Sequence, residues 1–314
     1  MVQNVNQRVD RNQCFIQKGN QMLQKIPKLH SVCLRCVAND RLSQFPEDAP
    51  EEDKMTYMKA VLKELSKMEN QHGPTIATRN IYDLQKSMFG YHESYLELRT
   101  RFNRLMMEKE SEIRKSIQQS EDSLKTAIQY AIAGNYIDFM VMKNVDEDTL
   151  NSLLQGAPDY KIDRDVLESL REDLGRAKSL VYLTDNCGEI VIDKLLIEQI
   201  RKMNPALQVT VIVRGEEILN DATMEDATQI GLMDVATVID NGDSLPGTCL
   251  YRISDEAKSE LNNADVVISK GQGNLEMLQG CNMNLYHIFL CKCEMISNMF
   301  QVPKFTPMLV KENK

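Results

Sequence analysis

The chain has 314 residues, of which 42% are hydrophobic and 26% charged, and its formal net charge is −9. This length allows about two domains with a sizeable core, and the ordinary composition excludes a disordered or low-complexity protein. The acidic balance argues against a nucleic-acid binder, which would carry a basic patch or stripe. The polar N-terminus has no apolar signal-peptide region, and no apolar stretch is long enough to cross a membrane. We therefore expect a cytoplasmic protein with neither a nucleic-acid nor a membrane partner.

Residues 51–174 have the periodicity of long amphipathic helices. Apolar side chains recur at spacings of three and four between Met58 and Met68, which places them on one buried stripe. Further helices are expected at about 93–107 and 111–133. The methionines on these stripes are typical of core filling.

The helical pattern breaks at Gly134, and Asn135 and Asp138 follow with a spacing of three. On local grounds alone, a helix cap or an Asx turn explains these two polar side chains. A role in a functional site needs support from other parts of the chain.

After Arg176, short apolar runs alternate with helices. Strands are expected at residues 179–183, 209–213, 236–239, 265–269 and 285–290. Helices are expected between them, including residues 190–203 and 255–262. Such alternation predicts a parallel sheet covered on both faces. We therefore expect an α/β protein, with a mainly helical domain in residues 1–175 covering the active site and a three-layer α/β/α, doubly wound, mainly parallel sheet in residues 176–314.

Polar residues follow the first predicted strand. Asp185 and Asn186 offer two adjacent oxygen ligands, and Gly188 lets the backbone turn tightly into the next helix. Glu189 and Asp193 lie four residues apart, so their side chains share a face of that helix. The competing interpretation is that Asp185 or Asn186 only caps the helix, with Glu189 balancing its dipole.

The second predicted strand also ends in polar residues, first Arg214-Gly215 and then Asn220-Asp221. Ligands of parallel sheets collect at the carboxyl ends of the strands, so Asp185 and Asp221 could bridge one cation there. The alternative is that Asp221 caps the helix expected at residues 224–230.

The fourth predicted strand ends in Lys270, followed by Gly271, Gly273 and Asn274 before the next helix. Glycines let backbone amides approach an oxyanion, and the positive end of the helix dipole favours one. A lysine at this position can place a point charge on phosphate. Taken by itself, the glycine turn is a weak signal.

Patterns of several other enzyme classes are absent from the chain. The four histidines occur in no triad-like context, and no GxSxG elbow is present. The glycine turn is neither a GxGxxG nor a GxxxxGK[ST] pattern, which argues against dinucleotide and P-loop nucleotide sites. Cys187 lies near a helix start, but a buried thiol explains it better than a nucleophile.

These polar motifs form an ordered set along the chain. The set comprises Asp185-Asn186-Cys187-Gly188-Glu189 with Asp193, Arg214-Gly215, Asn220-Asp221-Ala222-Thr223, and Ser269-Lys270-Gly271-Gln272-Gly273-Asn274 with Glu276. Flanking motifs are Ala133-Gly134-Asn135 with Ile137-Asp138, Phe289-Leu290 with Lys292-Cys293-Glu294, and Cys33-Leu34-Arg35-Cys36. Together they resemble the damage-control phosphatases, long catalogued as domain of unknown function 89. The CxxC motif resembles that of the prokaryotic branch.

This resemblance implies a helical domain packed on an α/β/α domain, and a metal-dependent phosphatase acting on small phosphorylated metabolites. Carried over by motif, the metal ligands are Asp185, Asn186 and Asp221, and Lys270 holds the phosphate. Further candidates for the site are Glu189, Arg214, Asn135 and Asp138.

The leading hypothesis is phosphomonoester hydrolysis of sugar phosphates or damaged cofactor phosphates, with a metal-activated water as nucleophile. Lys270 and the amides from Gly271 to Asn274 would stabilise the developing charge, and Glu189 would manage the proton. Oxygen ligands suit Mg or Mn, and Co or Ni also fit. The alternatives are a carboxyl methyltransferase that uses S-adenosylmethionine, and a metal or small-molecule binding protein without turnover.

The eight cysteines include one CxxC motif, formed by Cys33 and Cys36. In a chain without a secretory signal, cysteines are typical of thiols, buried small residues or metal ligands. Cys33, Cys36 and Cys293 could gather a structural metal or remain buried thiols, and the absence of a second CxxC slightly favours thiols.

Overall fold

The computed structural model describes residues 29–43, 49–68, 73–89, 95–137 and 147–312. The helices of the first part are α1 (Ser31–Ser43), α2 (Glu51–Lys67), α3 (Pro74–Phe89), α4 (Leu96–Gln119), α5 (Ser123–Gly134), α6 (Glu147–Gly156), the 3-10 helix η1 (Ala157–Asp159) and α7 (Arg164–Arg176). The second part contains β1 (Ser179–Leu183), α8 (Glu189–Met203), β2 (Gln208–Val213), α9 (Met224–Gln229), η2 (Leu232–Asp234), β3 (Thr237–Asp240), α10 (Asp255–Asn263), β4 (Val266–Lys270), α11 (Gly271–Leu278), β5 (Leu285–Leu290), α12 (Glu294–Phe300) and β6 (Pro307–Lys311). Helices therefore come first and the alternating elements follow, as predicted. No helix in these ranges is long and apolar enough to cross a membrane.

The strands of the described chain form one six-stranded sheet in the order β3-β2-β1-β4-β5-β6. Strands β1 to β5 are parallel, and β6 pairs antiparallel with β5. The winding reverses between β1 and β4, where Val181 lies beside Val267. The predicted fold class is confirmed. Doubly wound sheets bind ligands beside this reversal, at the carboxyl ends of the strands.

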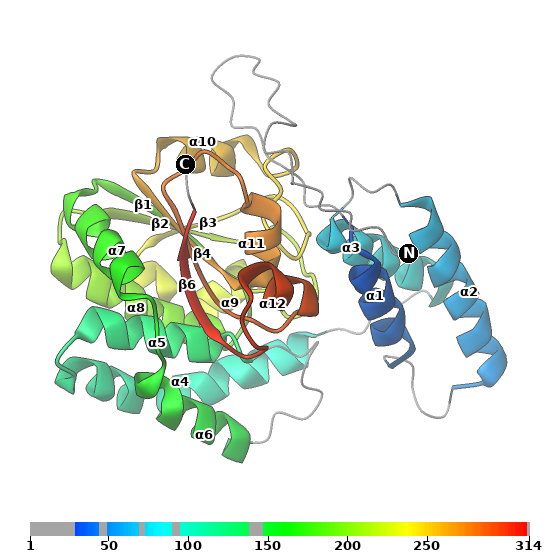
Figure 1. Ribbon diagram of the computed structural model, residues 1–314, viewed down its shortest axis with the longest axis horizontal. Coiled ribbons are helices and arrows are strands. Elements are labelled where there is room, and N and C mark those ends of the chain that lie inside the picture. Colours follow the sequence, from blue (N-terminus) through cyan, green and yellow to red (C-terminus); the bar gives the residue numbers. More distant parts are fainter. Residues whose placement is uncertain (1–28, 44–48, 69–72, 90–94, 138–146, 313–314) are drawn as a thin grey trace, which may run out of the picture.

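Helices cover both faces of the sheet (Figure 1). Leu180 and Ile268 face the largest apolar cluster, to which α4, α5, α7 and α8 contribute. Their sequence neighbours Val181 and Val267 lie on the opposite face, where they pack toward Leu261 of α10. Strands buried on both faces read as continuous apolar runs, which is why β1, β2, β4 and β5 are recognisable in the sequence.

The strand β6 is absent from the predicted elements. It pairs with β5 through contacts such as Leu309 opposite Ile288, and Leu309 is its one buried residue. A short edge strand that begins at Pro307 and ends at Lys311 carries little apolar pattern, because only one face meets the core.

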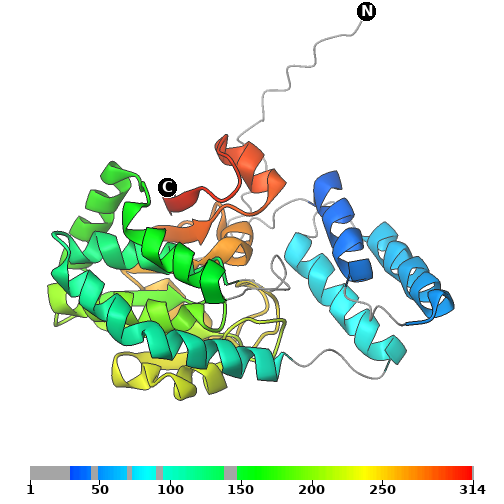
Figure 2. The ribbon, with the colours of Figure 1, turned by 90° about the horizontal axis from the view of Figure 1, so that it is seen from below.

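Helices α1, α2 and α3 form a separate lobe, called the cap below (Figures 1 and 2). Its core contains Val37, Tyr57, Val61 and Ile81. Helices α4 to α7 instead share the core of the sheet, and α5 packs directly on α8. The sequence predicts one helical domain over residues 1–175, but packing joins the second half of that region to the α/β body. The body therefore comprises α4 to β6.

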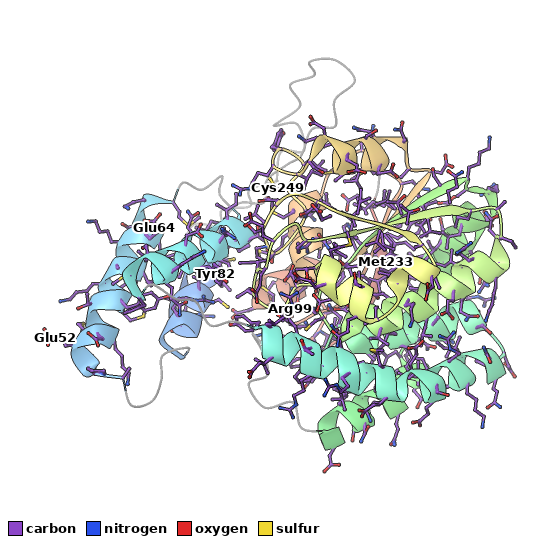
Figure 3. All side chains as sticks on the ribbon, turned by 180° about the vertical axis from the view of Figure 1, so that it is seen from behind. Glu52, Glu64, Tyr82, Arg99, Met233 and Cys249 are labelled. Carbon is purple, nitrogen blue, oxygen red and sulfur yellow. The ribbon has the colours of Figure 1, made fainter. Side chains whose placement is uncertain are left out.

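The cap touches the body along the carboxyl ends of the strands. Tyr82 of α3, which Figure 3 shows on the side of the cap nearest the body, packs with Ile218 and Leu219 from the loop after β2. The Thr75 hydroxyl lies 2.8 Å from the Met277 sulfur of α11. These contacts set the cap over the edge of the sheet where the predicted site residues lie.

Candidate active site

The loops after β1 and β2 pair with each other and bring the predicted metal ligands together. Asn186 and Asp221 form an isolated antiparallel bridge, and the Ala222 amide donates to the Asp185 carbonyl at 2.8 Å. The Asn220 side-chain amide donates to Asn186 Oδ1 at 2.8 Å. Two loops that are more than thirty residues apart in sequence therefore act as one support for these three side chains.

The competing cap interpretations are not supported by the helix starts. The N-cap of α8 is Gly188, with a φ of 70° and no side-chain cap bond. The N-cap of α9 is Thr223, which forms a capping box with Asp226. Neither helix therefore uses Asp185, Asn186 or Asp221 as its N-cap.

A layer of amides and carboxylates lies behind Asp185. Asn135 Nδ2 donates to Asp185 Oδ2 at 2.9 Å and to both oxygens of Glu189, while its Oδ1 accepts from the Leu290 amide. Asn186 Nδ2 bridges the same two carboxylates, at 2.8 Å from each. Asn135 therefore orients Asp185 through bonds that a simple helix cap would not make.

Lys270 lies deeper than the sequence suggests. Its ammonium is fully buried and donates to Glu189 Oε1 at 2.5 Å, to Asp193 Oδ1 at 2.7 Å and to the Ala131 carbonyl at 2.9 Å. Burial acts to lower the pKa of Lys270, but the charges of Asp193 and Glu189 outweigh it and raise the pKa. An ammonium has three donors, so all of them are already used.

Arg214 also lies behind the ligand loops. It is buried, and its Nε donates to Asp221 Oδ2 at 2.6 Å. The guanidinium therefore holds the Asp221 carboxylate from the side of the sheet, which fixes its direction toward the edge.

The start of α11 closes the base of the site. Gly271 has a φ of 76°, and a Cβ there would lie only 1.9 Å from Asp185 Oδ2, so this position needs glycine. Gly273 lines the pocket described next. Asn274 points inward, where its Nδ2 donates to the Thr184 carbonyl at 3.0 Å. Asn274 therefore joins the ends of β1 and β4 and does not face the pocket.

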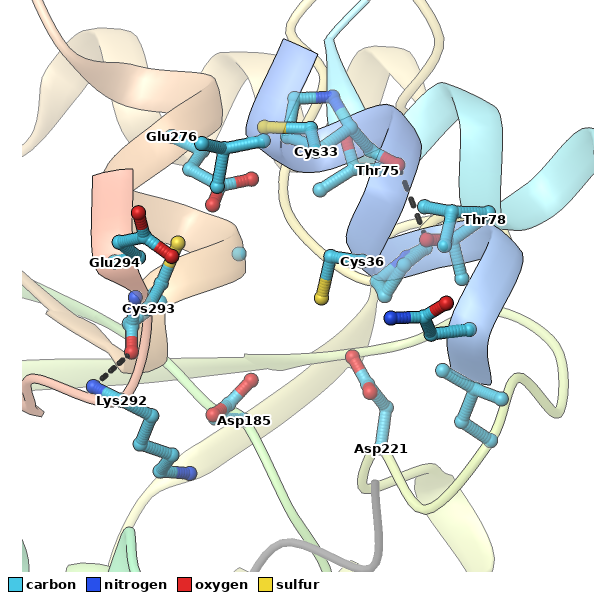
Figure 4. A pocket seen from close by; sticks show the side chains of 18 of the residues that line it. Cys33, Cys36, Thr75, Thr78, Asp185, Asp221, Glu276, Lys292, Cys293 and Glu294 are labelled. Atoms are coloured by element: carbon cyan, nitrogen blue, oxygen red, sulfur yellow. Dashed lines mark hydrogen bonds between the residues drawn. The ribbon is translucent and has the colours of Figure 1, made fainter. Parts of the chain in front are cut away.

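A pocket of about 650 Å³ lies between the cap and the body. Figure 4 shows Asp185 and Asp221 pointing into it, with Cys36 of α1 on the opposite wall. Of the predicted site residues, those that line the pocket are Asp185, Asn186, Asp221 and Gly273. Those that lie behind its wall are Asn135, Glu189, Arg214, Lys270, Gly271 and Asn274. Asp138 falls outside the described residues.

Lys292 is a pocket residue to which the sequence motifs gave no role, although it stands in the Lys292-Cys293-Glu294 motif. It follows β5, lines the pocket and lies on the Asp185 side of it in Figure 4. Its backbone amide donates to Gln272 Oε1 at 2.6 Å, which ties it to the start of α11. Its place directly after a strand of the parallel sheet is the signal that could have found it.

The charges around Asp185 are unbalanced. Burial, followed by the nearby carboxylates Glu189 and Asp221, raises the pKa of Asp185 well above its ordinary range. The positive charges of Lys292 and Arg214 act in the opposite direction. A divalent cation would remove this cost, and two carboxylates with one amide oxygen form a donor set that hard cations prefer. The residues present therefore fit a metal ion.

Within the described ranges, no group of three histidine, cysteine, aspartate or glutamate side chains is placed to hold a metal ion. The Asp185, Asn186 and Asp221 set includes an amide, so it is not a group of that kind. Cys33, Cys36 and Cys293 are all described residues, and they do not come together as such a group.

Comparison with known proteins supports the family resemblance that the sequence motifs indicate. The model of the damage-control phosphatase ARMT1-like domain matches residues 29–306. The chain belongs to the damage-control phosphatase family. A damage-control phosphatase of Pyrococcus horikoshii, PH1575, is 30% identical over 285 residues, covering 88% of this chain and 96% of the relative. A damage-control phosphatase of Archaeoglobus fulgidus is 31% identical over 237 residues, covering 73% and 77%.

The fold agrees with this family. The crystal structure of PH1575, described as a DUF89 family protein, superposes with a TM-score of 0.78 at 29% identity, covering 91% of this chain and 99% of the other. Family membership supports a phosphatase role on damaged metabolites. The damage-control phosphatase motifs thus lie where the doubly wound sheet places its ligands.

Proposed function

We propose that this chain is a metal-dependent phosphatase that hydrolyses phosphate monoesters of small metabolites. The observation that carries the proposal is the convergence of Asp185, Asn186 and Asp221 on one pocket at the reversal point of the sheet. The pocket volume of about 650 Å³ suits a small molecule.

Asp185, Asn186 and Asp221 would hold the divalent cation, with Mg, Mn, Co and Ni as candidates. When bound, the cation supplies Lewis-acid activation of the phosphoryl group and of a water molecule. Arg214 fixes one oxygen of Asp221, and Asn135 fixes one oxygen of Asp185. Both carboxylates are therefore oriented before a substrate arrives.

On the phosphate side we assign Lys292 in place of Lys270. Lys292 lines the pocket next to Asp185, whereas the Lys270 ammonium is buried on three acceptors. The Gly273 amide, in the first turn of α11, lies on the same wall and adds the positive end of a helix dipole. Lys292 and this turn would balance the charge that develops on the phosphoryl oxygens.

Lys270 and Glu189 act as positioning residues in this account. Glu189 accepts bonds from Lys270, Asn135 and Asn186, so its oxygens are occupied by fixed partners. The role first expected for Glu189, transfer of a proton to or from the substrate, would require it to reach the pocket. We assign it instead to orienting the two amides that hold Asp185.

The direct test is turnover of p-nitrophenyl phosphate by wild type and Asp221→Asn. We expect the variant to lose about 10²–10³-fold in kcat/KM, because it removes a ligand charge while keeping the shape. Circular dichroism should show an intact fold.

The matched control is Asp173→Asn, which removes a carboxylate that bonds Lys311 and Tyr286 away from the pocket. This variant should keep wild-type turnover even if its stability falls. Full turnover by Asp221→Asn, or equal losses in both variants, would contradict the proposal.

A further inference from the structure

Three cysteine side chains line the active-site pocket from two different parts of the fold. Cys33 and Cys36 lie on α1 of the cap, and Cys293 directly precedes α12 of the body. Figure 4 shows Cys33 and Cys293 on the side of Glu276 and Glu294, whereas Cys36 lies nearer Asp221. None of the three forms a disulfide. The mechanism proposed above uses none of them.

Of the three pocket thiols, Cys33 and Cys293 share an apolar environment, together with the buried Cys291. Both belong to one apolar cluster, in which the Cys33 sulfur lies 3.9 Å from Met295 Sδ on α12. An ion pair of 2.7 Å between Arg35 and Glu294 holds α1 against α12 at the same point. Cys36, in contrast, is exposed and lies outside this cluster.

Among the described residues, the cysteines and carboxylates form no group of three placed to hold a metal ion. A disulfide requires only two sulfur atoms to meet. The difference in exposure also fits a two-step oxidation, since Cys293 is partly exposed whereas Cys33 is buried. Burial raises the pKa of the Cys33 thiol, which disfavours it as the first thiol to react.

We propose that Cys33 and Cys293 form a reversible disulfide that joins the cap to the body and closes the pocket. The Cys293 thiolate attacks a peroxide oxygen, the O–O bond breaks, and one water leaves after proton uptake, giving a sulfenic acid. The Cys33 sulfur then attacks the Cys293 sulfur, and the S–O bond breaks. The departing hydroxide takes the Cys33 proton as a second water. Two thiols thus lose two electrons, which reduce one peroxide to two waters.

The bond would draw together two walls of the pocket that Cys33 and Cys293 line. Cys33, Cys293 and Asp185 line one pocket, so we expect oxidation to slow turnover and a thiol reductant to restore it. The effect on turnover rests on the phosphatase function proposed above, but the bond itself does not.

The test oxidises the intact chain with hydrogen peroxide, blocks the remaining thiols and maps tryptic peptides by mass spectrometry. Trypsin cleaves after Arg35 and after Lys292, so Cys33, Cys36 and Cys293 fall on three separate peptides. We expect one linked peptide pair, containing Cys33 and Cys293, which disappears on treatment with dithiothreitol. Turnover should fall by about tenfold or more on oxidation and return on reduction.

Three variants give the matched comparison, each scored by its ratio of oxidised to reduced turnover. Cys33→Ser should lose the sensitivity to peroxide, whereas Cys36→Ser and Cys249→Ser should keep it.

A Cys33–Cys36 disulfide, oxidation without a linked peptide, or zinc retained at one equivalent and lost in Cys33→Ser would each overturn the proposal. Peptide mapping also separates the two proposals, because a chain without phosphatase activity would still form the bond.

Discussion

The two walls of the pocket are built in different ways. On the body wall, Asp185 and Asp221 are each held by a buried partner, Asn135 and Arg214 respectively. On the cap wall, the Thr78 hydroxyl donates to the Pro74 carbonyl of its own helix, and the Thr75 hydroxyl reaches the Met277 sulfur of the body. Because the candidate ligand carboxylates are held within the body, we propose that the body performs the chemistry and that the cap contributes to substrate selection.

The separate core of the cap supports this division. Val61 and Ile81 are buried among other cap residues and do not join the core of the sheet. The cap thus has a core of its own, although Tyr82 joins it to Ile218 and Leu219 in the loop after β2. The predictions below test whether substitutions on the two sides behave as differently as this comparison implies.

The largest effect is expected behind the body wall, at Lys270. Lys270→Met leaves the buried carboxylates of Glu189 and Asp193 without their cation, so we expect a loss of about 3–5 kcal/mol in unfolding free energy. Urea denaturation followed by circular dichroism measures it. Lys194→Met is the control, because Lys194 also bonds a carboxylate, Glu110, but at a less buried position. Equal losses in the two variants would show that Lys270 has no special structural role.

Lys292 tests the phosphate side of the body wall. Lys292→Met should lower kcat/KM for p-nitrophenyl phosphate by about 10²-fold, because it removes a charge from the phosphoryl group in the transition state. The control is Lys304→Met, which removes an exposed lysine from the same pocket. A loss in Lys304→Met that matched the loss in Lys292→Met would indicate a general effect of charge.

Glu276 provides a test through pH. Burial raises the pKa of this carboxyl, which lines the pocket, from 4.5 to about 8. Between pH 4.5 and about 8, the Glu276 carboxyl is ionised in the unfolded chain but protonated in the native state. Its contribution to the free energy of unfolding therefore falls as the pH rises toward 8. Glu276→Gln should remove that slope, with a gain on the order of 1–2 kcal/mol at pH 8 after allowance for water in the pocket.

The measurement for Glu276 is the urea midpoint of both proteins at pH 5, 7 and 9, with a chelator present. The difference between variant and wild type should grow with pH up to about 8 and then stay constant. A difference that is the same at all three values would contradict the buried-carboxyl assignment.

The smallest effect is expected on the cap wall. Thr78→Val should change kcat/KM by less than about fivefold, through KM and by different amounts for different sugar and cofactor phosphates. Screening a panel of phosphorylated metabolites with both proteins measures this. A uniform fall in kcat for every substrate would place Thr78 with the catalytic groups and remove the distinction between the walls.

Much of the body could be predicted from the sequence because its strands are buried on both faces. β1 and β5 begin and end at the expected residues, and Asp185 and Asp221 lie at the strand ends where ligands collect. The sequence could not show the direction of a side chain at a strand end. Lys270 closes β4 and turns into the core, whereas Lys292, one residue beyond the Cys291 that follows β5, lines the pocket.

In the helical half of the chain, prediction from the sequence is limited in a different way. Helices α2 and α4 have similar amphipathic periodicity, so the local pattern predicts both as helices but not their partners. Only the packing reveals that Phe102 of α4 belongs to the core of the sheet and Tyr57 of α2 to the cap. Sequence patterns could therefore not predict which helices form the cap wall of the pocket.

The central claim is that Asp185, Asn186 and Asp221 hold a cation that turnover requires. The most direct measurement strips metal from the protein with a chelator and then titrates Mn²⁺ while recording both binding and hydrolysis of p-nitrophenyl phosphate. We predict no turnover in the stripped protein, recovery in step with about one bound cation per chain, and loss of this binding in Asp185→Asn. Full turnover by the stripped protein, or unchanged Mn²⁺ binding in Asp185→Asn, would contradict the account.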